Sequence, residues 1–428
     1  MRTRALMLVL CSMTAACAPS MHGGNMPRPL PTLPALERAA PAVVGMSPAL
    51  GATLDSIMAA GVAGGAAPGA ELAVGRYGRI VYMKGFGQLD PQLEPAPPND
   101  STLWDMASLT KVTATTTAAM LLYDDGKLDI NRPVSFYLPE FNAPDKAGIT
   151  VRMLLEHSSG FISGANLWRT MRGRPPFLQA INARPLAYTP GDSSIYSDWN
   201  FILTGMIVER ITGMREDEFL QQRAWGPLGM KDTGFNPLAT GPLPPDSDCT
   251  AALGMATPAR LARIAPTEVD TVYRHRHIHG IVHDENSCAL LGVAGHAGLF
   301  TSARDLAVLA QMLLNEGEYG GTRILRSGTV TRWTSRQNRF SSRGLGWDTP
   351  SARSSAGRYF GPRSFGHTGF TGTSIWIDPE KGLFVILLTN RVNPTRANMK
   401  VEPLRRAVAD AAQSAILDAP LLDWSSRR

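Results

Sequence analysis

Lysine is scarce in this 428-residue sequence: seven of its 42 basic residues are lysines, and the other 35 are arginines. The arginines are scattered, no run of like charge occurs despite the net charge of +6, and aromatic residues make up only 7%. Proteins that bind single-stranded nucleic acid combine a basic groove with aromatic side chains. We therefore expect no nucleic-acid partner. Because lysine is rare in this sequence, Lys111 at the head of an apolar segment is a candidate for a specific role.

The apolar run near the N-terminus, Ala5–Met13, is too short to span a bilayer. Arg2 and Arg4 precede it, which is the layout of an export signal. Cys17 then follows two alanines, as the lipidated cysteine of a bacterial lipoprotein does, although simple secretion stays open. We predict a signal peptide over 1–17, a lipid on Cys17, and export to the periplasm or cell envelope, with membrane contact only through this anchor.

Cysteine is nearly absent from the rest of the chain. Beyond the signal region only Cys249 and Cys288 remain, both in a loop-rich segment between two expected helices. In an oxidising compartment two such thiols pair when their Cα atoms approach to about 4.4–6.8 Å. We predict a disulfide between them; the alternative is two separate thiols in a flexible loop.

The remaining sequence predicts one large α+β domain. Residues 18–46 are rich in proline and predict a tether, and the folded domain is expected over 47–420. Alternating apolar patterns predict strands within 47–107 and about 320–420, whereas helical patterns fill about 108–319. This order predicts an antiparallel sheet assembled from both ends of the chain, flanked by helices, with a helical insertion.

Three short motifs carry chemistry. Ser108 lies where extended chain turns into a helix, and Lys111 follows one turn later on the same face, where a neutral amine could accept the serine proton. Tyr196 follows a Pro-Gly loop and could relay protons beside an ammonium. In "GHTGF", Gly369 would let a substrate backbone approach a strand edge. Taken alone, each motif also has an explanation without function. The Ser-Lys spacing could occur by chance, Tyr196 could be an ordinary loop tyrosine, and Gly369 could mark a bulge in a strand.

Together and in this order, the motifs resemble those of the serine β-lactamase and penicillin-binding protein superfamily, most closely its class C β-lactamase-like branch. Stretches such as "GKLDINRPVSFYLPEF" and "GVAGHAGLFTSARDLA" extend the likeness over about 47–415. The resemblance implies a β-lactamase / D,D-peptidase-like fold and a serine hydrolase that forms an acyl-enzyme without metal or cofactor. It implies these roles: Ser108 as nucleophile, Lys111 as base partner, Tyr196 as proton relay, His367, Thr368 and Gly369 as substrate-binding strand, and the N–H groups of Ser108 and Phe370 as oxyanion donors.

Two departures from the family pattern concern the substrate. Asp198 stands where asparagine is usual, and an ionised carboxylate cannot donate to a substrate carbonyl. His367 replaces the lysine typical of β-lactamases, and a mostly neutral imidazole would hold a carboxylate less strongly. We therefore predict hydrolysis of an amide or ester, such as a peptidoglycan-derived peptide (D-Ala-D-Ala carboxypeptidase, muropeptide amidase or esterase), by a monomer. The alternatives are a β-lactamase and a non-catalytic peptidoglycan- or penicillin-binding module.

The most unusual segment of the sequence is rich in histidine. His275, His277 and His279 alternate, so on a strand they would share a face and could bind a metal. No carboxylate or cysteine lies at a ligand spacing, and we expect these histidines to flank the cleft without a metal. His283 and Asp284 resemble a feature of amidase-like relatives and are expected to contact the substrate.

Overall fold

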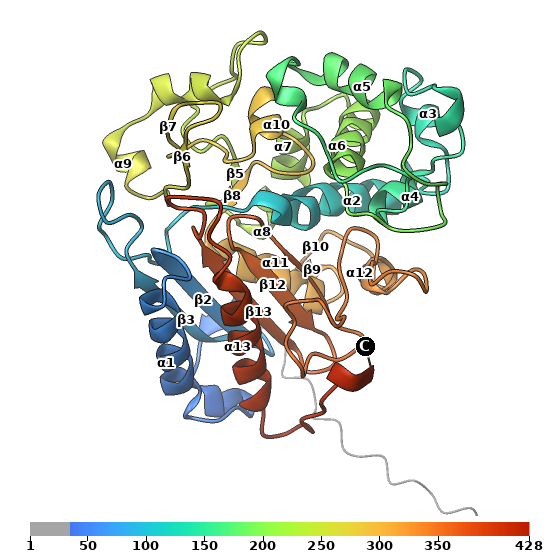
Figure 1. Ribbon diagram of the computed structural model, residues 1–428. Helices are drawn as coiled ribbons and strands as arrows, with labels where there is room; N and C mark the ends of the chain where they lie inside the picture. Colours follow the sequence, from blue (N-terminus) through green and yellow to red (C-terminus); the bar gives the residue numbers. More distant parts are fainter. Residues whose placement is uncertain (1–34, 428) are drawn as a thin grey trace, which may run out of the picture.

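Both ends of the chain contribute to one six-stranded sheet (Figure 1). The computed structural model describes residues 35–427. In spatial order the strands are β1 (Glu37–Arg38), β3 (Arg79–Gly87), β2 (Gly69–Arg76), β13 (Leu383–Thr389), β12 (Ser374–Asp378) and β11 (Phe365–Thr368). Neighbouring strands are antiparallel except for the pair β1 and β3. The α+β class predicted from the sequence is confirmed, and β11, which carries the His-Thr-Gly motif, forms one edge.

Helices cover both faces of this sheet. Helices α1 (Leu50–Ala63) and α13 (Val401–Ser414) pack together against one face, and α11 (Ala303–Leu314) lies against the other (Figure 1). Successive side chains of a strand point to opposite faces. Accordingly, Leu387 packs with α1 and α13, whereas its neighbour Leu388 belongs to the core that contains α11.

A second, mainly helical region lies above the sheet in Figure 1. Its helices are α2 (Thr117–Asp124), α3 (Val134–Tyr137), α4 (Val151–Leu155), α5 (Arg174–Ala183), α6 (Asp198–Thr212), α7 (Glu216–Leu220), α8 (Gly226–Leu228), α9 (Pro258–Leu261) and α10 (Glu285–Ala289). Short strands join it to the sheet layer: β4 (Trp104–Asp105), β8 (Leu299–Thr301) and β5 (Gly234–Phe235) form one small sheet, and β6 (Val269–Asp270) pairs with β7 (Arg276–His277). Beside the main sheet lie the hairpin β9 (Glu318–Tyr319) and β10 (Thr322–Arg323) and helix α12 (Thr329–Thr334).

The predicted disulfide is confirmed. Cys249 and Cys288 are bonded; their Cα atoms are 4.6 Å apart, and the two residues are separated by 39 in sequence number. Because Cys288 belongs to α10, the bond fixes the loop-rich segment to the helix that follows His283 and Asp284. The loop is therefore tied to the helical region at both ends.

The chain enters the fold earlier than the sequence predicts. The tether was expected to extend to residue 46, but β1 pairs with β3 through Glu37 and Arg38, and Val44 and Met46 are buried beside α1. The burial of Val44 and Met46 and the pairing of β1 with the edge of β3 explain why these residues belong to the fold and not to the tether. The predicted signal peptide and Cys17 lie outside the described residues. Within residues 35–427, no helix is both long and apolar enough to cross a membrane.

Candidate active site

Ser108 lies on a tight turn between β4 and the helical segment that leads into α2. The preceding residue, Ala107, has φ of +44°, a left-handed conformation that costs energy for a residue with a side chain. Asp105 holds this turn, because its two carboxylate oxygens accept hydrogen bonds from the backbone N–H groups of Ala107 at 2.8 Å and His283 at 2.7 Å. Ser108 is thereby presented, partly exposed, at the head of a buried helix.

The end of strand β11 packs directly against this turn. A Cβ atom on Gly369 would lie 2.5 Å from the carbonyl oxygen of Met106, so only glycine permits the approach. The hydroxyls of Thr371 and Thr373 donate to the carbonyls of Asp105 and Met106 at 2.7 and 3.1 Å. Gly369 therefore leaves room for the backbone of the turn that carries Ser108, whereas the sequence suggested that it leaves room for the backbone of a substrate.

Lys111 is fully buried and contacts the nucleophile. Its Nζ donates to Ser108 Oγ at 3.0 Å, to Asp198 Oδ1 at 2.7 Å, and to the backbone carbonyl of His296 at 2.9 Å. Three acceptors match the three N–H bonds of an ammonium. Burial disfavours the charge, but the negative charge of Asp198 outweighs burial and raises the pKa of Lys111. The neutral amine that the sequence analysis required is therefore not the resting form, because Asp198 stabilises the ammonium.

We expect Asp198→Asn to move the acid limb of the rate profile to lower pH. Asp198 favours the protonated form of Lys111, so its removal lowers the pKa at which the amine can accept a proton. The measurement is kcat/KM against pH, which reports the essential groups of the free enzyme. Asp192→Asn, in the exposed loop before Tyr196, is the control. A limb that stays in place or moves upward contradicts this account.

Tyr196 lies beside the lysine, between two histidine rings. Lys111 Nζ is 5.0 Å from the centre of the tyrosine ring, and the rings of His157 and His367 lie 4.5 and 5.9 Å from it. Within the described residues the tyrosine hydroxyl is buried and has no hydrogen-bond partner. It is therefore available to a reacting group that enters the site.

His367 is neutral in this environment. Burial, followed by the positive charges of Arg343 and Lys111, holds the pKa of His367 well below its ordinary value. Its Nδ1 donates to the carbonyl of Thr368 at 2.8 Å. The absence of a permanent charge at this position agrees with the sequence analysis.

Phe370 follows the motif on an exposed turn. The residue is 47% exposed, and its backbone N–H has no acceptor among residues 35–427. The buried Arg405 of α13 braces the turn by donating to the carbonyls of Gly369 and Thr373 at 2.8 and 3.0 Å. The turn is thus held rigid with an N–H free for an oxyanion, as the resemblance implies.

His283 and Asp284 both contact other residues of the protein. His283 is 3% exposed, its ring pairs with Glu268 at 2.9 Å, and it stacks under Phe370 at 5.8 Å. Asp284 caps α10 and accepts a hydrogen bond from the ring of His296 at 2.9 Å. These contacts position Phe370 and the loop that contacts Lys111; direct substrate contact through His283 conflicts with its burial.

Two of the alternating histidines, His277 and His279, contact backbone carbonyls, whereas His275 is exposed. The Nε2 atom of His277 lies 3.1 Å from the carbonyl of Thr267, and that of His279 lies 2.9 Å from the carbonyl of Ile264. Over residues 35–427, no three His, Cys, Asp or Glu side chains form a group that could hold a metal ion.

Three residues of the site were given no role from the sequence: His157, His296 and Arg343, although His296 stands in the family-like stretch "GVAGHAGLFTSARDLA". His157 accepts hydrogen bonds on Nδ1 from the N–H of Ser197 and the side chain of Asn200, both at 3.1 Å. Burial, followed by the charges of Arg343 and Lys111, holds the pKa of His157 well below its usual range. His296 contributes a backbone carbonyl, which any residue type could supply.

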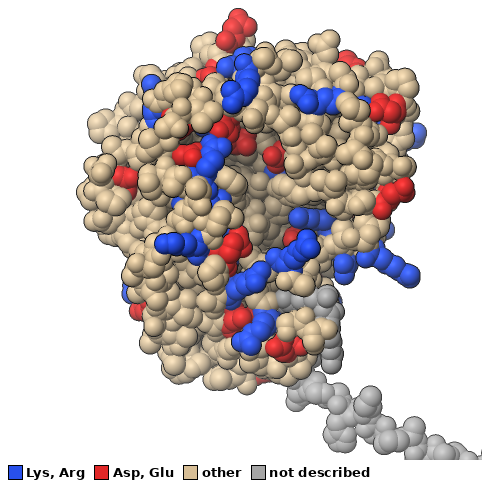
Figure 2. All heavy atoms as spheres, viewed as in Figure 1, with Lys and Arg blue, Asp and Glu red and all other residues tan. Residues whose placement is uncertain are grey.

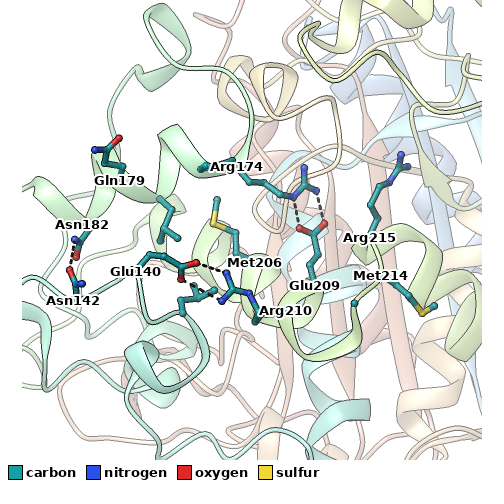
Figure 3. A pocket seen from close by; sticks show the side chains of 14 residues that line it. Glu140, Asn142, Arg174, Gln179, Asn182, Met206, Glu209, Arg210, Met214 and Arg215 are labelled. Atoms are coloured by element: carbon teal, nitrogen blue, oxygen red, sulfur yellow. Dashed lines mark hydrogen bonds and ion pairs between the residues drawn. The ribbon is translucent and has the colours of Figure 1, made fainter.

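A separate hollow lies away from the motif residues. The hollow has a volume of about 1050 Å³ and opens between α5 and the C-terminal half of α6. Two of its arginines form ion pairs within it, Arg174 with Glu209 and Arg210 with Glu140 (Figure 3). It contains none of the motif residues. Figure 2 shows a different hollow, where the helical region meets the sheet layer, with basic side chains on its rim.

The fold and the site together define a serine hydrolase: a serine contacts a buried lysine, a tyrosine lies beside the pair, and an edge strand ends at the nucleophile. The Beta-lactamase family model matches residues 54–410, and the chain belongs to this family. A protein of Salmonella agona (strain SL483), named "Putative D-alanyl-D-alanine carboxypeptidase", is 33% identical over 359 residues, which cover 78% of this chain and 82% of that protein.

Two solved structures show the same fold at lower identity. A class C β-lactamase has a TM-score of 0.64 and 17% identity, covering 85% of this chain and 96% of its own. "EstCE1, a hydrolase with promiscuous acyltransferase activity" has a TM-score of 0.65 and 20% identity, covering 85% and 98%. The resemblance stated from the motifs is confirmed.

Proposed function

We propose that this chain is a carboxypeptidase-type serine hydrolase that cleaves short peptides ending in D-alanine, or closely related amides and esters, through an acyl-enzyme on Ser108. The observation that carries the proposal is the 3.0 Å contact between Lys111 Nζ and Ser108 Oγ. The name of the Salmonella relative supports the substrate class.

In the proposed reaction the Lys111–Tyr196 pair first loses one proton to solvent, because Lys111 rests as an ammonium. Ser108 Oγ then bonds to the scissile carbonyl carbon while its proton passes to the deprotonated pair. The N–H groups of Ser108 and Phe370 hold the developing oxyanion. When this intermediate collapses, the bond to the leaving group breaks and the departing amine or alkoxide takes a proton from the same pair. Water then hydrolyses the ester on Ser108, which releases the acid and restores the serine.

An esterase is the second candidate, and Asp198 favours it. Its carboxylate pairs with Lys111 and offers no donor to an amide carbonyl of the substrate, and a simple ester has no such carbonyl to satisfy. Release of D-alanine from an acyl-D-Ala-D-Ala peptide, compared with hydrolysis of a p-nitrophenyl ester, tests the proposal. Ester turnover without any peptide cleavage would favour the second candidate.

We expect nitrocefin to be hydrolysed with a kcat/KM about 10- to 100-fold below that of a short ester or peptide, the effect of losing one charge-assisted contact. The fused rings of a cephalosporin fix its carboxylate near its reacting carbonyl, where the motif offers a neutral His367. Initial rates on the same enzyme preparation give the comparison. Rapid cephalosporin hydrolysis would instead identify a β-lactamase.

Export to the cell envelope and lipid attachment at Cys17 are further proposals. The Cys249–Cys288 bond supports export, because disulfides form and persist in oxidising compartments. Mass spectrometry of the mature protein from the membrane fraction tests both the cleavage site and the lipid.

A further inference from the structure

The cations of the motifs are not available to a substrate carboxylate. His367 is neutral, and all three N–H bonds of Lys111 are directed at acceptors within the protein. A substrate that ends in D-alanine nevertheless carries a free carboxylate on its leaving group. The proposed function therefore needs a positive charge from another part of the chain.

Arg343 provides a cation beside the tyrosine. Its guanidinium carbon lies 5.3 Å from the centre of the Tyr196 ring, and the side chain is 19% exposed. Its nearest carboxylate, Asp348, is 3.9 Å away, which is beyond hydrogen-bond distance. The guanidinium therefore keeps donors that can bind a ligand.

The backbone fixes this arginine next to the substrate-binding strand. Asp348 exchanges two backbone hydrogen bonds of 2.9 Å with Gly366, the residue before His367 on the outer edge of β11. Within the loop, the N–H of Gly344 donates to the carbonyl of Trp347 at 2.9 Å. A short loop pinned at this edge holds Arg343 in place before a ligand arrives, which limits the entropy lost on binding.

A second arginine near the site is already occupied. The guanidinium of Arg391 lies 4.6 Å from the ring of Phe370, but it donates to the carbonyls of Arg396, at 3.0 Å, and Asn398. Arg391 lies at the oxyanion side, whereas Arg343 lies at Tyr196, the group that the mechanism places beside the leaving group. Arg343 is therefore the better placed of the two.

We propose that Arg343 determines specificity by binding the free carboxylate on the leaving group of the substrate; this rests on the proposed function. A guanidinium can donate two parallel hydrogen bonds to a carboxylate, which an ammonium cannot match in geometry. The site would thus favour acyl compounds whose leaving group is an amino acid or hydroxy acid with a free carboxylate.

The test compares Arg343→Gln and Arg343→Lys with wild type on two matched pairs of substrates. One pair is an acyl-D-Ala-D-Ala peptide and its C-terminal amide; the other is the acyl-D-Ala-D-lactate depsipeptide and its C-terminal amide. We expect Arg343→Gln to lower kcat/KM on the free acids about 10- to 100-fold, mainly through KM, and to change the amides less than about threefold. Arg343→Lys should retain part of the preference.

Arg339→Gln, an exposed arginine in the same loop, is the control and should match wild type. An equal loss on acids and amides would show that Arg343 only positions Tyr196, and an unchanged preference for acids would equally overturn the proposal. If neither peptide is cleaved but the depsipeptide acid is preferred and loses that preference in Arg343→Gln, the assignment of Arg343 stands and the peptidase function fails.

Discussion

Ser108→Ala should lower hydrolysis of every substrate by about 10⁴- to 10⁶-fold, the range seen when a hydrolase loses its nucleophile. The change removes one hydroxyl from a partly exposed turn whose geometry is held by Asp105, so the fold should persist. Steady-state rates, covalent labelling by a fluorophosphonate or a fluorescent penicillin, and the melting temperature measure the three consequences.

Ser193→Ala, an exposed serine in the loop before Tyr196, is the matched control and should behave as wild type. A Ser108→Ala protein that melts normally, yet retains most of its activity or still accepts the label, would remove Ser108 from the mechanism. A non-catalytic binding module would instead show no turnover in the wild-type chain.

Lys111→Arg should be nearly as damaging as Lys111→Ala, with losses of roughly 10²- to 10⁴-fold, the range for general acid–base catalysis. Guanidinium keeps its proton at any working pH and cannot accept one from Ser108. It would still satisfy Asp198, so a role limited to charge should survive the change. The variant thereby separates proton transfer from electrostatics.

Because Lys111 is fully buried, the larger arginine could disturb packing, and the comparison needs a check on folding. Lys111→Met, which keeps the volume without the charge, provides a second variant, and Lys127→Arg, at a side chain 60% exposed, provides the control. Circular dichroism and melting temperature identify folded proteins. A folded, active Lys111→Arg enzyme would assign the lysine a purely electrostatic role.

The sequence motif predicts which residue Lys111 contacts, but the surroundings of Lys111 determine its charge in the resting enzyme. The one-turn spacing predicts contact with Ser108, and the structure has that contact at 3.0 Å. Burial alone would favour the neutral amine that catalysis needs, but Asp198 reverses the shift and raises the pKa of Lys111. The pairing of positions 111 and 198 depends on how α6 packs against the nucleophile helix, which no local pattern encodes.

The sequence by itself determined the α+β order, the two-ended sheet, the family and the Ser-Lys, Tyr and His-Thr-Gly motifs, because periodicity, turn residues and short spacings are local properties. Only the tertiary structure decided what surrounds them. Lys111 meets Asp198 across 87 positions and the carbonyl of His296 across 185. A backbone carbonyl has no residue signature, and Arg343 is one arginine among 35 until folding brings it to Tyr196. Such contacts are set by the packing of distant elements, and this packing determines the charge at the site.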